Sequence, residues 1–88
     1  MELERMIEIE RNIIQIFDEC RAEKNLSIEA LGKKVYPHEA SPYMKIQSLR
    51  KPQKNGKPRR LSVGEFMAIC EALELDHVRV LIDAAERK

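Results

Sequence analysis

The stretch SPYMKIQSLRKPQKNGKPRR, residues 41–60, decides how the fold is organised. It opens with Ser41, a favoured helix N-cap, and Pro42, whose missing N–H costs nothing at the first helical position. We expect a short helix over 42–51 because the residue before Pro52 is disfavoured in a helix. A loop punctuated by glycine and proline follows. The basic residues of the stretch are Lys45, Arg50, Lys51, Lys54, Lys57, Arg59 and Arg60, with no acidic residue among them.

The charge of this stretch contrasts with the rest of the chain. It contributes +7 to a formal net charge of only +1, so the remaining residues are acidic on balance. DNA phosphates attract such a concentration of positive charge, and a short helix beside it can enter the major groove. The alternative interpretation of a charge run is a solvated surface loop. The strict separation of sign favours a binding surface for an anionic partner.

Length and composition predict one compact domain. The chain has 88 residues, of which 43% are hydrophobic and 35% charged, so we expect a single globular domain over 1–88. Cys20 and Cys70 fit neither a disulfide framework nor a zinc site, and we expect two buried thiols in a reducing compartment. The N-terminal residues lack a signal peptide's apolar core, and no apolar run approaches membrane-spanning length. We therefore expect a cytoplasmic protein that does not bind a membrane.

Helical periodicity dominates the first third of the chain. Apolar residues recur at i, i+3, i+4 and i+7 over 3–24, interrupted by Glu10 and Arg21, which predicts one long amphipathic helix. Residues 1–10 extend it beyond what a minimal core requires. A second helix is expected over 28–36, preceded by Asn25, Leu26 and the N-cap Ser27, and burying Leu31 and Val35. Gly32 weakens this helix unless another helix approaches closely there.

Two further helices are predicted after the basic loop 52–60. Ser62 and Glu65 form a capping-box pattern that starts a helix running to Leu73. Its expected inward residues are Phe66, Ile69, Cys70 and Leu73. Asp76 caps a last helix, whose expected inward residues are Val78, Leu81 and Ile82. No segment alternates with a period of two, so the chain is predicted to be all-α with five helices.

Metal sites and catalytic arrangements are not indicated. His38 lies in a predicted turn and His77 at a helix start, and no ligand spacing relates them. The sequence contains no paired carboxylates in an apolar setting, no Ser/His/Asp arrangement and no glycine-rich phosphate loop. We therefore expect no metal, no cofactor and no enzymatic activity.

The order of these elements resembles the phage repressor and Cro-like helix-turn-helix DNA-binding domains. Residues 21–32, RAEKNLSIEALG, are similar to the end of the family's first helix and its Leu-Ser-x-x-x-Leu-Ala second helix. Ile46 and Leu49 match the buried pair of its recognition helix. Residues 57–61, KPRRL, with the later apolar positions up to Val78, resemble its phosphate-binding loop and last two helices. The resemblance covers residues 13 to 82.

This resemblance implies a five-helix lambda-repressor-like domain with an extended first helix, acting as a transcriptional regulator. The recognition helix 42–51 would lie in the major groove of a pseudo-palindromic operator bound by a homodimer. The implied base-reading residues are Tyr43, Met44, Lys45, Gln47 and Ser48. The implied phosphate-binding residues are Arg50, Lys51, Lys54, Lys57, Arg59 and Arg60.

The chain also departs from the family pattern. The turn between the second and third helices carries Tyr36 where the family has glycine, and it is longer by about four residues. Arg50 stands where many members have glutamate, and residues 1–10 have no counterpart in the minimal domain. The alternative function is a protein-interaction module on the same scaffold, an antitoxin-like or accessory subunit using the long first helix. RNA binding is disfavoured because Tyr43 is the one aromatic residue near the basic stretch that is available for base stacking.

Overall fold

The computed structural model describes residues 1–52, 54–57 and 59–87. Residues 53 and 58 of the predicted basic loop, and residue 88 of the predicted domain, lie outside the described residues. The all-helical prediction is confirmed, and the described part of the chain is compact, with a radius of gyration of 12.6 Å. Its five helices are α1 (Leu3–Glu23), α2 (Ile28–Val35), α3 (Pro42–Arg50), α4 (Val63–Leu73) and α5 (His77–Glu86).

The helix starts follow from the capping residues in the sequence. The Ser27 hydroxyl accepts a hydrogen bond from the Ala30 N–H at 3.0 Å, and Ser62 with Glu65 forms the predicted capping box of α4. The Asp76 carboxylate likewise caps α5. Ser41 occupies the N-cap position of α3, but its side chain makes no capping hydrogen bond. Three helices end one residue earlier than predicted, at Glu23, Val35 and Arg50.

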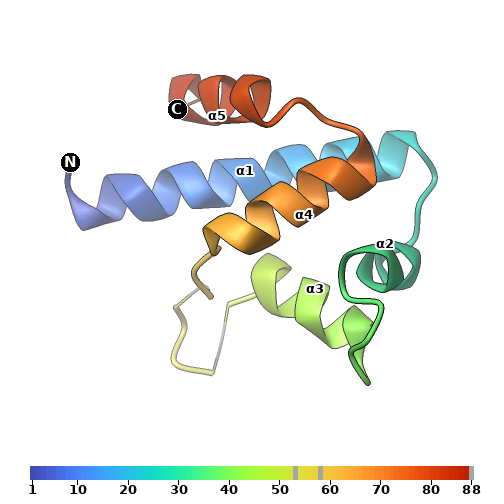
Figure 1. The fold of residues 1–88 in the computed structure, drawn as a ribbon. Coiled ribbons are helices and arrows are strands. Elements are labelled where there is room, and N and C mark those ends of the chain that lie inside the picture. Colours follow the sequence, from blue (N-terminus) through green and yellow to red (C-terminus); the bar gives the residue numbers. More distant parts are fainter. Residues whose placement is uncertain (53, 58, 88) are drawn as a thin grey trace.

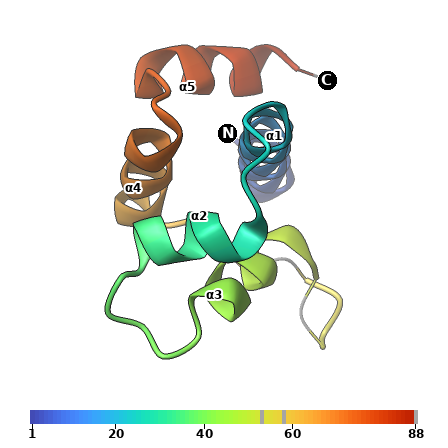
Figure 2. The same ribbon diagram turned by 90° about the vertical axis from the view of Figure 1, so that its right-hand side faces the viewer.

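The five helices form layers around α1 and α4. α1 packs against α4 and α5, and α2 packs against α3 and α4. In Figures 1 and 2, α5 lies on one side of α1 and α4, and the α2–α3 pair lies on the opposite side. The loop between α3 and α4 emerges at the edge of this second side (Figure 1). In this arrangement no other described helix packs on one long face of α3.

The core is almost entirely aliphatic, as the low aromatic content requires. Leu49, Ile69 and Leu73 are at most 2% exposed. The rings of Phe17 and Phe66 lie 6.0 Å apart between α1 and α4, a distance within the favourable range for aromatic pairs. The predicted inward residues of α3 and α4 are all buried: Ile46, Leu49, Phe66, Ile69, Cys70 and Leu73.

Gly32 is the point of closest approach between α2 and α3. A Cβ atom built at this position would lie 2.7 Å from the carbonyl oxygen of Pro42 and 2.8 Å from its carbonyl carbon. Both are backbone atoms at the first residue of α3, so a side chain there requires the helix itself to shift. The close approach expected from the glycine is therefore confirmed.

The buried face of α5 differs from the prediction. Val80 and Ala84 are buried, and the Ala84 carbonyl accepts a hydrogen bond from Asn12 of α1 at 3.0 Å. These small residues are four positions apart and allow α5 to approach α1 closely. Three side chains that were expected to be buried are instead about half exposed: Val78, Leu81 and Ile82.

The N-terminal part of α1 contacts α5 but leaves apolar side chains in solvent. Arg5 donates a hydrogen bond to the Ala85 carbonyl at 2.6 Å, which ties the predicted extension 1–10 to the last helix. Leu3 and Met6 nevertheless remain exposed. Among the described residues, none of the helices combines the length and the apolar character that crossing a bilayer requires.

Candidate nucleic-acid interface

The uncovered face of α3 carries the predicted base-reading residues. Ile46 and Leu49 anchor the helix in the core and are 4% and 1% exposed. Helical periodicity then turns the intervening residues outward. Tyr43, Met44 and Lys45 are exposed, while Gln47 and Ser48 are partly buried. All five predicted base-reading residues therefore lie on the solvent side of one short, well-anchored helix.

Gln47 is held by its neighbours on α3. Its Nε2 donates a hydrogen bond to the Tyr43 hydroxyl at 2.9 Å, and its Oε1 accepts one from Arg50 Nη1. The amide is thus oriented along the helix surface. A bidentate contact with adenine requires Gln47 to exchange these two bonds for bonds to the base.

Ser48 joins α3 to the basic loop. Its hydroxyl donates to the Lys45 carbonyl at 2.8 Å and accepts from Arg59 Nε at 2.7 Å. Arg59 also donates to the Lys45 carbonyl at 3.1 Å. These bonds fix the end of the loop against α3.

Arg59 is the centre of a network that connects the loop with α2 and α4. Its guanidinium forms a bidentate pair with Glu65, at 3.0 Å and 2.8 Å. The hydroxyl of Tyr36, which lies just beyond α2, donates a hydrogen bond to the same carboxylate at Glu65 Oε2. Burial and the Glu65 hydrogen bond raise the pKa of Tyr36 to about 12. Tyr36 thus links the turn between α2 and α3 to α4.

Glu65 is kept ionised by the same network. Burial alone would raise its pKa, but hydrogen bonds from Arg59, Tyr36 and Ser62 outweigh this effect and lower the pKa to about 2. Hydrogen bonds to the charged form of a carboxylate favour ionisation in this way. Glu65 therefore serves both as a member of the α4 capping box and as the carboxylate that balances Arg59.

Two more predicted phosphate-binding arginines are paired with acidic residues of α1. Arg60 donates to both carboxylate oxygens of Glu10, at 2.9 Å and 2.6 Å, and these bonds lower the pKa of Glu10. Arg50 Nε lies 2.9 Å from both oxygens of Asp18. Glu10 also accepts from the Leu61 N–H at 3.1 Å, so it fixes the far end of the loop.

The predicted phosphate-binding residues therefore form two groups. Arg50, Arg59 and Arg60 are balanced by carboxylates from α1 and α4. The exposed lysines of the loop, which have no carboxylate within 4 Å among the described residues, are Lys51, Lys54 and Lys57. The sign separation along the sequence is thus partly cancelled in space, because residues far away in the sequence contribute the opposing charges.

Sequence reasoning missed the acidic partners and one further arginine, Arg11. Glu10 was visible as an interruption of the apolar stripe of α1, and this interruption was the signal that it faces another element. Asp18 carried no comparable signal. Arg11 is partly buried and donates a hydrogen bond to the Leu49 carbonyl at the end of α3. Burial lowers the pKa of Arg11.

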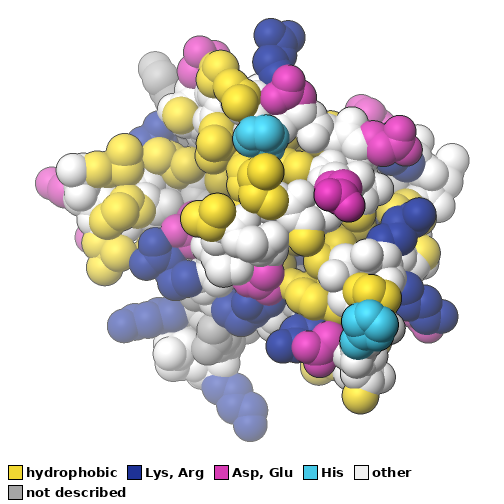
Figure 3. All heavy atoms as spheres, in the orientation of Figure 1, with side chains coloured by type: hydrophobic (Ala, Val, Ile, Leu, Met, Phe, Trp, Pro, Cys, Tyr) yellow, Lys and Arg dark blue, Asp and Glu magenta, His cyan; other side chains and the backbone are white. Residues whose placement is uncertain are grey.

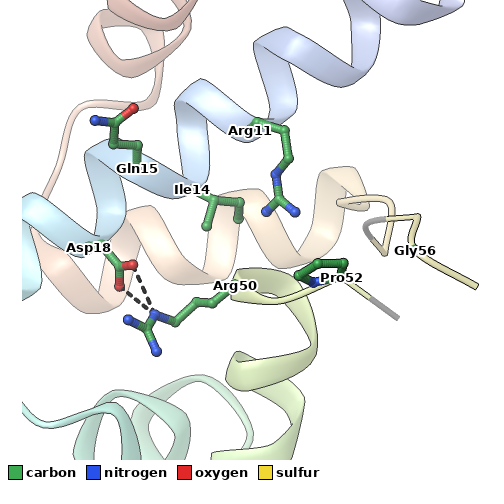
Figure 4. Close-up of a pocket in the computed structure, with 7 residues that line it drawn as sticks. All are labelled: Arg11, Ile14, Gln15, Asp18, Arg50, Pro52 and Gly56. Atoms are coloured by element: carbon green, nitrogen blue, oxygen red, sulfur yellow. Dashed lines mark hydrogen bonds and ion pairs between the residues drawn. The ribbon is translucent and has the colours of Figure 1, made fainter. Parts of the chain in front are cut away.

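A polar cleft separates α1 from the end of α3 and the loop. It has a volume of about 380 Å³, and Figure 4 shows the side chains of Arg11 and Arg50 reaching into this region from different helices. The lining residues are Arg11, Ile14, Gln15, Asp18, Arg50, Pro52 and Gly56.

An apolar surface lies over α1, α4 and α5. Figure 3 shows hydrophobic side chains gathered on this part of the molecule, whereas basic side chains project from the edge near the α3–α4 loop. The surface contains a groove of about 260 Å³. The apolar residues that line the groove are Ile13, Leu61, Val63, Phe66, Met67 and Leu81.

Metal ligands do not gather in the described ranges 1–52, 54–57 and 59–87. No cluster of three or more histidine, cysteine, aspartate or glutamate side chains there is arranged to hold an ion. Cys70 is buried, which raises the pKa of its thiol to about 11, and Cys20 is partly buried.

Comparisons with protein-family models, with curated proteins and with solved structures find no match to this chain.

Proposed function

We propose that the protein is a sequence-specific binder of double-stranded DNA with a lambda-repressor-like helix-turn-helix fold, acting as a transcriptional regulator. The observation that carries the proposal is the exposed face of α3 and its position next to a loop with three exposed lysines. α2 supports α3 from behind, and Gly32 allows the two helices to pack closely. A rigid, polar helix flanked by positive charge has the shape and charge required for the major groove.

The side chains of α3 provide chemistry for reading bases. Lys45 can donate to the acceptor atoms of guanine, and Gln47 to adenine, while Met44 and Tyr43 can contact a thymine methyl group. Ser48 can pair with several bases but is engaged by Arg59. Each well-formed bidentate base contact typically discriminates against the wrong base by about 1–3 kcal/mol.

Lys51, Lys54 and Lys57 act as the main phosphate-binding residues in this proposal. Their exposure leaves them available to replace condensed counterions on DNA. Arg50, Arg59 and Arg60 act mainly by positioning α3 and the loop, because each is already paired with a carboxylate. This division refines the uniform role that the sequence suggested for all six residues.

A homodimer is the proposed binding unit. One recognition helix reads only a few base pairs, so a long operator requires two copies whose half-sites are about 34 Å apart. The apolar surface of α1, α4 and α5 supports this proposal, because Leu3, Val63 and Leu81 are exposed and available to a second copy. α1 and α5, which carry part of this surface, pack side by side in the fold.

A protein-interaction module is the second candidate function. The apolar groove favours it, because its lining is largely hydrophobic. In this alternative the groove binds a different protein, and α3 has no nucleic-acid partner.

The salt dependence of duplex binding tests whether the loop lysines contact phosphates. We expect the triple variant Lys51→Gln, Lys54→Gln, Lys57→Gln to weaken binding to all duplexes and to reduce the slope of log K against log salt by about 0.9 for each lost contact. Fluorescence anisotropy with a labelled duplex at several salt concentrations measures this slope.

A charge-matched control separates contact from net charge. The variant Lys24→Gln, Lys34→Gln, Arg79→Gln removes three exposed charges outside α3 and the loop, and we expect it to keep the wild-type slope. Equal slopes for both triple variants would show that the loop makes no phosphate contacts and would contradict the proposal.

A further inference from the structure

The cleft between α1 and the α3–α4 loop contains a positive charge that the protein does not balance. Two guanidiniums, those of Arg11 and Arg50, and one carboxylate, Asp18, line it. Arg50 is paired with Asp18 at 2.9 Å. Arg11 has no carboxylate within 4 Å among the described residues, so the excess positive charge of the cleft belongs to Arg11.

The hydrogen bonding of Arg11 is also incomplete. In the described part of the chain its guanidinium donates one hydrogen bond, to the Leu49 carbonyl, whereas a guanidinium has five N–H donors. The neighbouring Glu10 interacts with Arg11 electrostatically, but Glu10 is itself engaged by Arg60 and the Leu61 N–H. Arg11 therefore has donors available in a partly desolvated position.

The contact with Leu49 has a structural role, but this role does not explain the unpaired charge of Arg11 or its unused N–H donors among the described residues. Leu49 is in the last turn of α3, where carbonyl groups lack helical partners and a positive charge is favourable. One N–H group of Arg11 fulfils this role. The contact holds the guanidinium at the cleft. Figure 4 shows this guanidinium pointing from α1 toward the end of α3, and Pro52 and Gly56 of the loop also line the cleft.

We propose that this cleft is an anion-binding site in which Arg11 binds a phosphate group. Guanidinium groups suit phosphate because their forked N–H donors match its oxygens. Lys54 and Lys57 lie two residues before and one residue after Gly56 in the sequence and add to the positive potential. The cleft volume of about 380 Å³ exceeds what one phosphate group needs, so the group can belong to a larger molecule.

The phosphate can come from two sources. The backbone of duplex DNA is one, since the cleft adjoins α3 and the loop, and this source rests on the proposed function. A free phosphate ester is the other, and it would couple a small molecule to the position of the loop. Both sources require the same contact at Arg11.

NMR spectroscopy of the arginine side chains tests this inference on the whole chain. The Nε–H signals are followed while inorganic phosphate is added at constant ionic strength, and separately while a duplex is added. Wild type is compared with Arg11→Gln and with Arg79→Gln, which removes an exposed arginine from α5. Thermal unfolding is measured in parallel, to separate binding from the role of Arg11 at the end of α3.

Saturable shifts of the Arg11 and Arg50 signals with phosphate would support a site for free phosphate, provided that the Arg50 shift is lost in Arg11→Gln and both shifts are kept in Arg79→Gln. Shifts of the same signals with duplex alone would support the site with DNA as its source. Absence of both responses in a folded protein would overturn the inference. Duplex binding without a shift of the Arg11 signal would contradict the anion site but leave the proposed DNA-binding function intact. A phosphate-induced shift without any duplex binding would support the anion site and contradict the proposed function.

Discussion

At the scale of single residues, Gly32 shows how one missing side chain permits the packing of two helices. We expect Gly32→Ala to destabilise the protein by about 1–3 kcal/mol, the usual cost of overpacking. The new Cβ would meet the backbone of Pro42 at 2.7 Å, and this clash outweighs the better helix propensity of alanine. Chemical denaturation monitored by circular dichroism measures the change.

Gly64 provides a matched control for this prediction. It also lies inside a helix, but a Cβ atom there would meet nothing within 4 Å. Gly64→Ala should therefore be neutral or slightly stabilising. A free energy of unfolding that falls equally in both variants would contradict the close-approach explanation.

Glu65 makes the stability of the loop network sensitive to acid. Its folded-state pKa of about 2 lies below the ordinary value of 4.5, so its contribution is complete above about pH 4.5 and is lost as the pH falls toward 2. We expect Glu65→Gln to be less stable than wild type at neutral pH and to approach it in stability at acid pH. Urea denaturation at a series of pH values measures the difference.

Glu71 serves as the control because it is exposed on the same helix. Glu71→Gln should follow the wild-type profile. A stability difference between Glu65→Gln and wild type that stays constant from pH 7 to pH 2 would show that the carboxylate charge is not the stabilising feature.

At the scale of elements, α3 combines a buried anchor with an exposed face that is proposed to read bases. We expect Gln47→Ala to reduce preference at one base position by about 1–3 kcal/mol, with little change in non-specific affinity or salt slope. The reason is that Gln47 is uncharged and contributes no phosphate neutralisation. Binding profiles over a duplex library, compared for wild type and variant, measure this effect.

The variant Tyr43→Phe complements Gln47→Ala by testing the restraint on the Gln47 amide. It removes the hydroxyl that accepts a hydrogen bond from Gln47 while keeping the ring, so the amide becomes less restrained. An unchanged profile for Gln47→Ala would exclude Gln47 from base reading, irrespective of the result for Tyr43→Phe.

The helices could be predicted from sequence because their ends carry local signals. Ser27, Ser62 and Asp76 each cap a helix through their own side chains, and such contacts depend only on neighbouring residues. The orientation of α5 could not be predicted in this way. Its sequence HVRVLIDAAE supports more than one apolar face, and the fit of Val80 and Ala84 against α1 selects one of them.

At the scale of the whole molecule, tertiary contacts pair several residues of the basic stretch with carboxylates. The sequence places seven basic residues between positions 41 and 60. In the fold, Glu10 and Asp18 of α1 and Glu65 of α4 approach three of them. These partners lie up to fifty residues from the arginines in the chain, so no local pattern predicts which basic residues are paired with carboxylates.

The distribution of surfaces also emerges only at this scale. α5 lies on one side of α1 and α4, with α2 and α3 on the other (Figure 2). The apolar groove is formed by residues from α1, α4, α5 and the end of the α3–α4 loop. Neither the polar cleft nor this groove has a signature in a single stretch of sequence, because each is assembled from separate elements.

Selection of bound sequences from a randomised duplex pool, at low and at moderate salt, tests whether the protein binds a specific DNA sequence. We predict a pseudo-palindromic motif whose half-sites are separated by about one helical turn, with binding that weakens as salt rises. Such a motif requires both a base-reading helix and a paired binding unit. The absence of any bound duplex, even at low salt, would contradict DNA binding and would favour the protein-interaction function of the apolar groove.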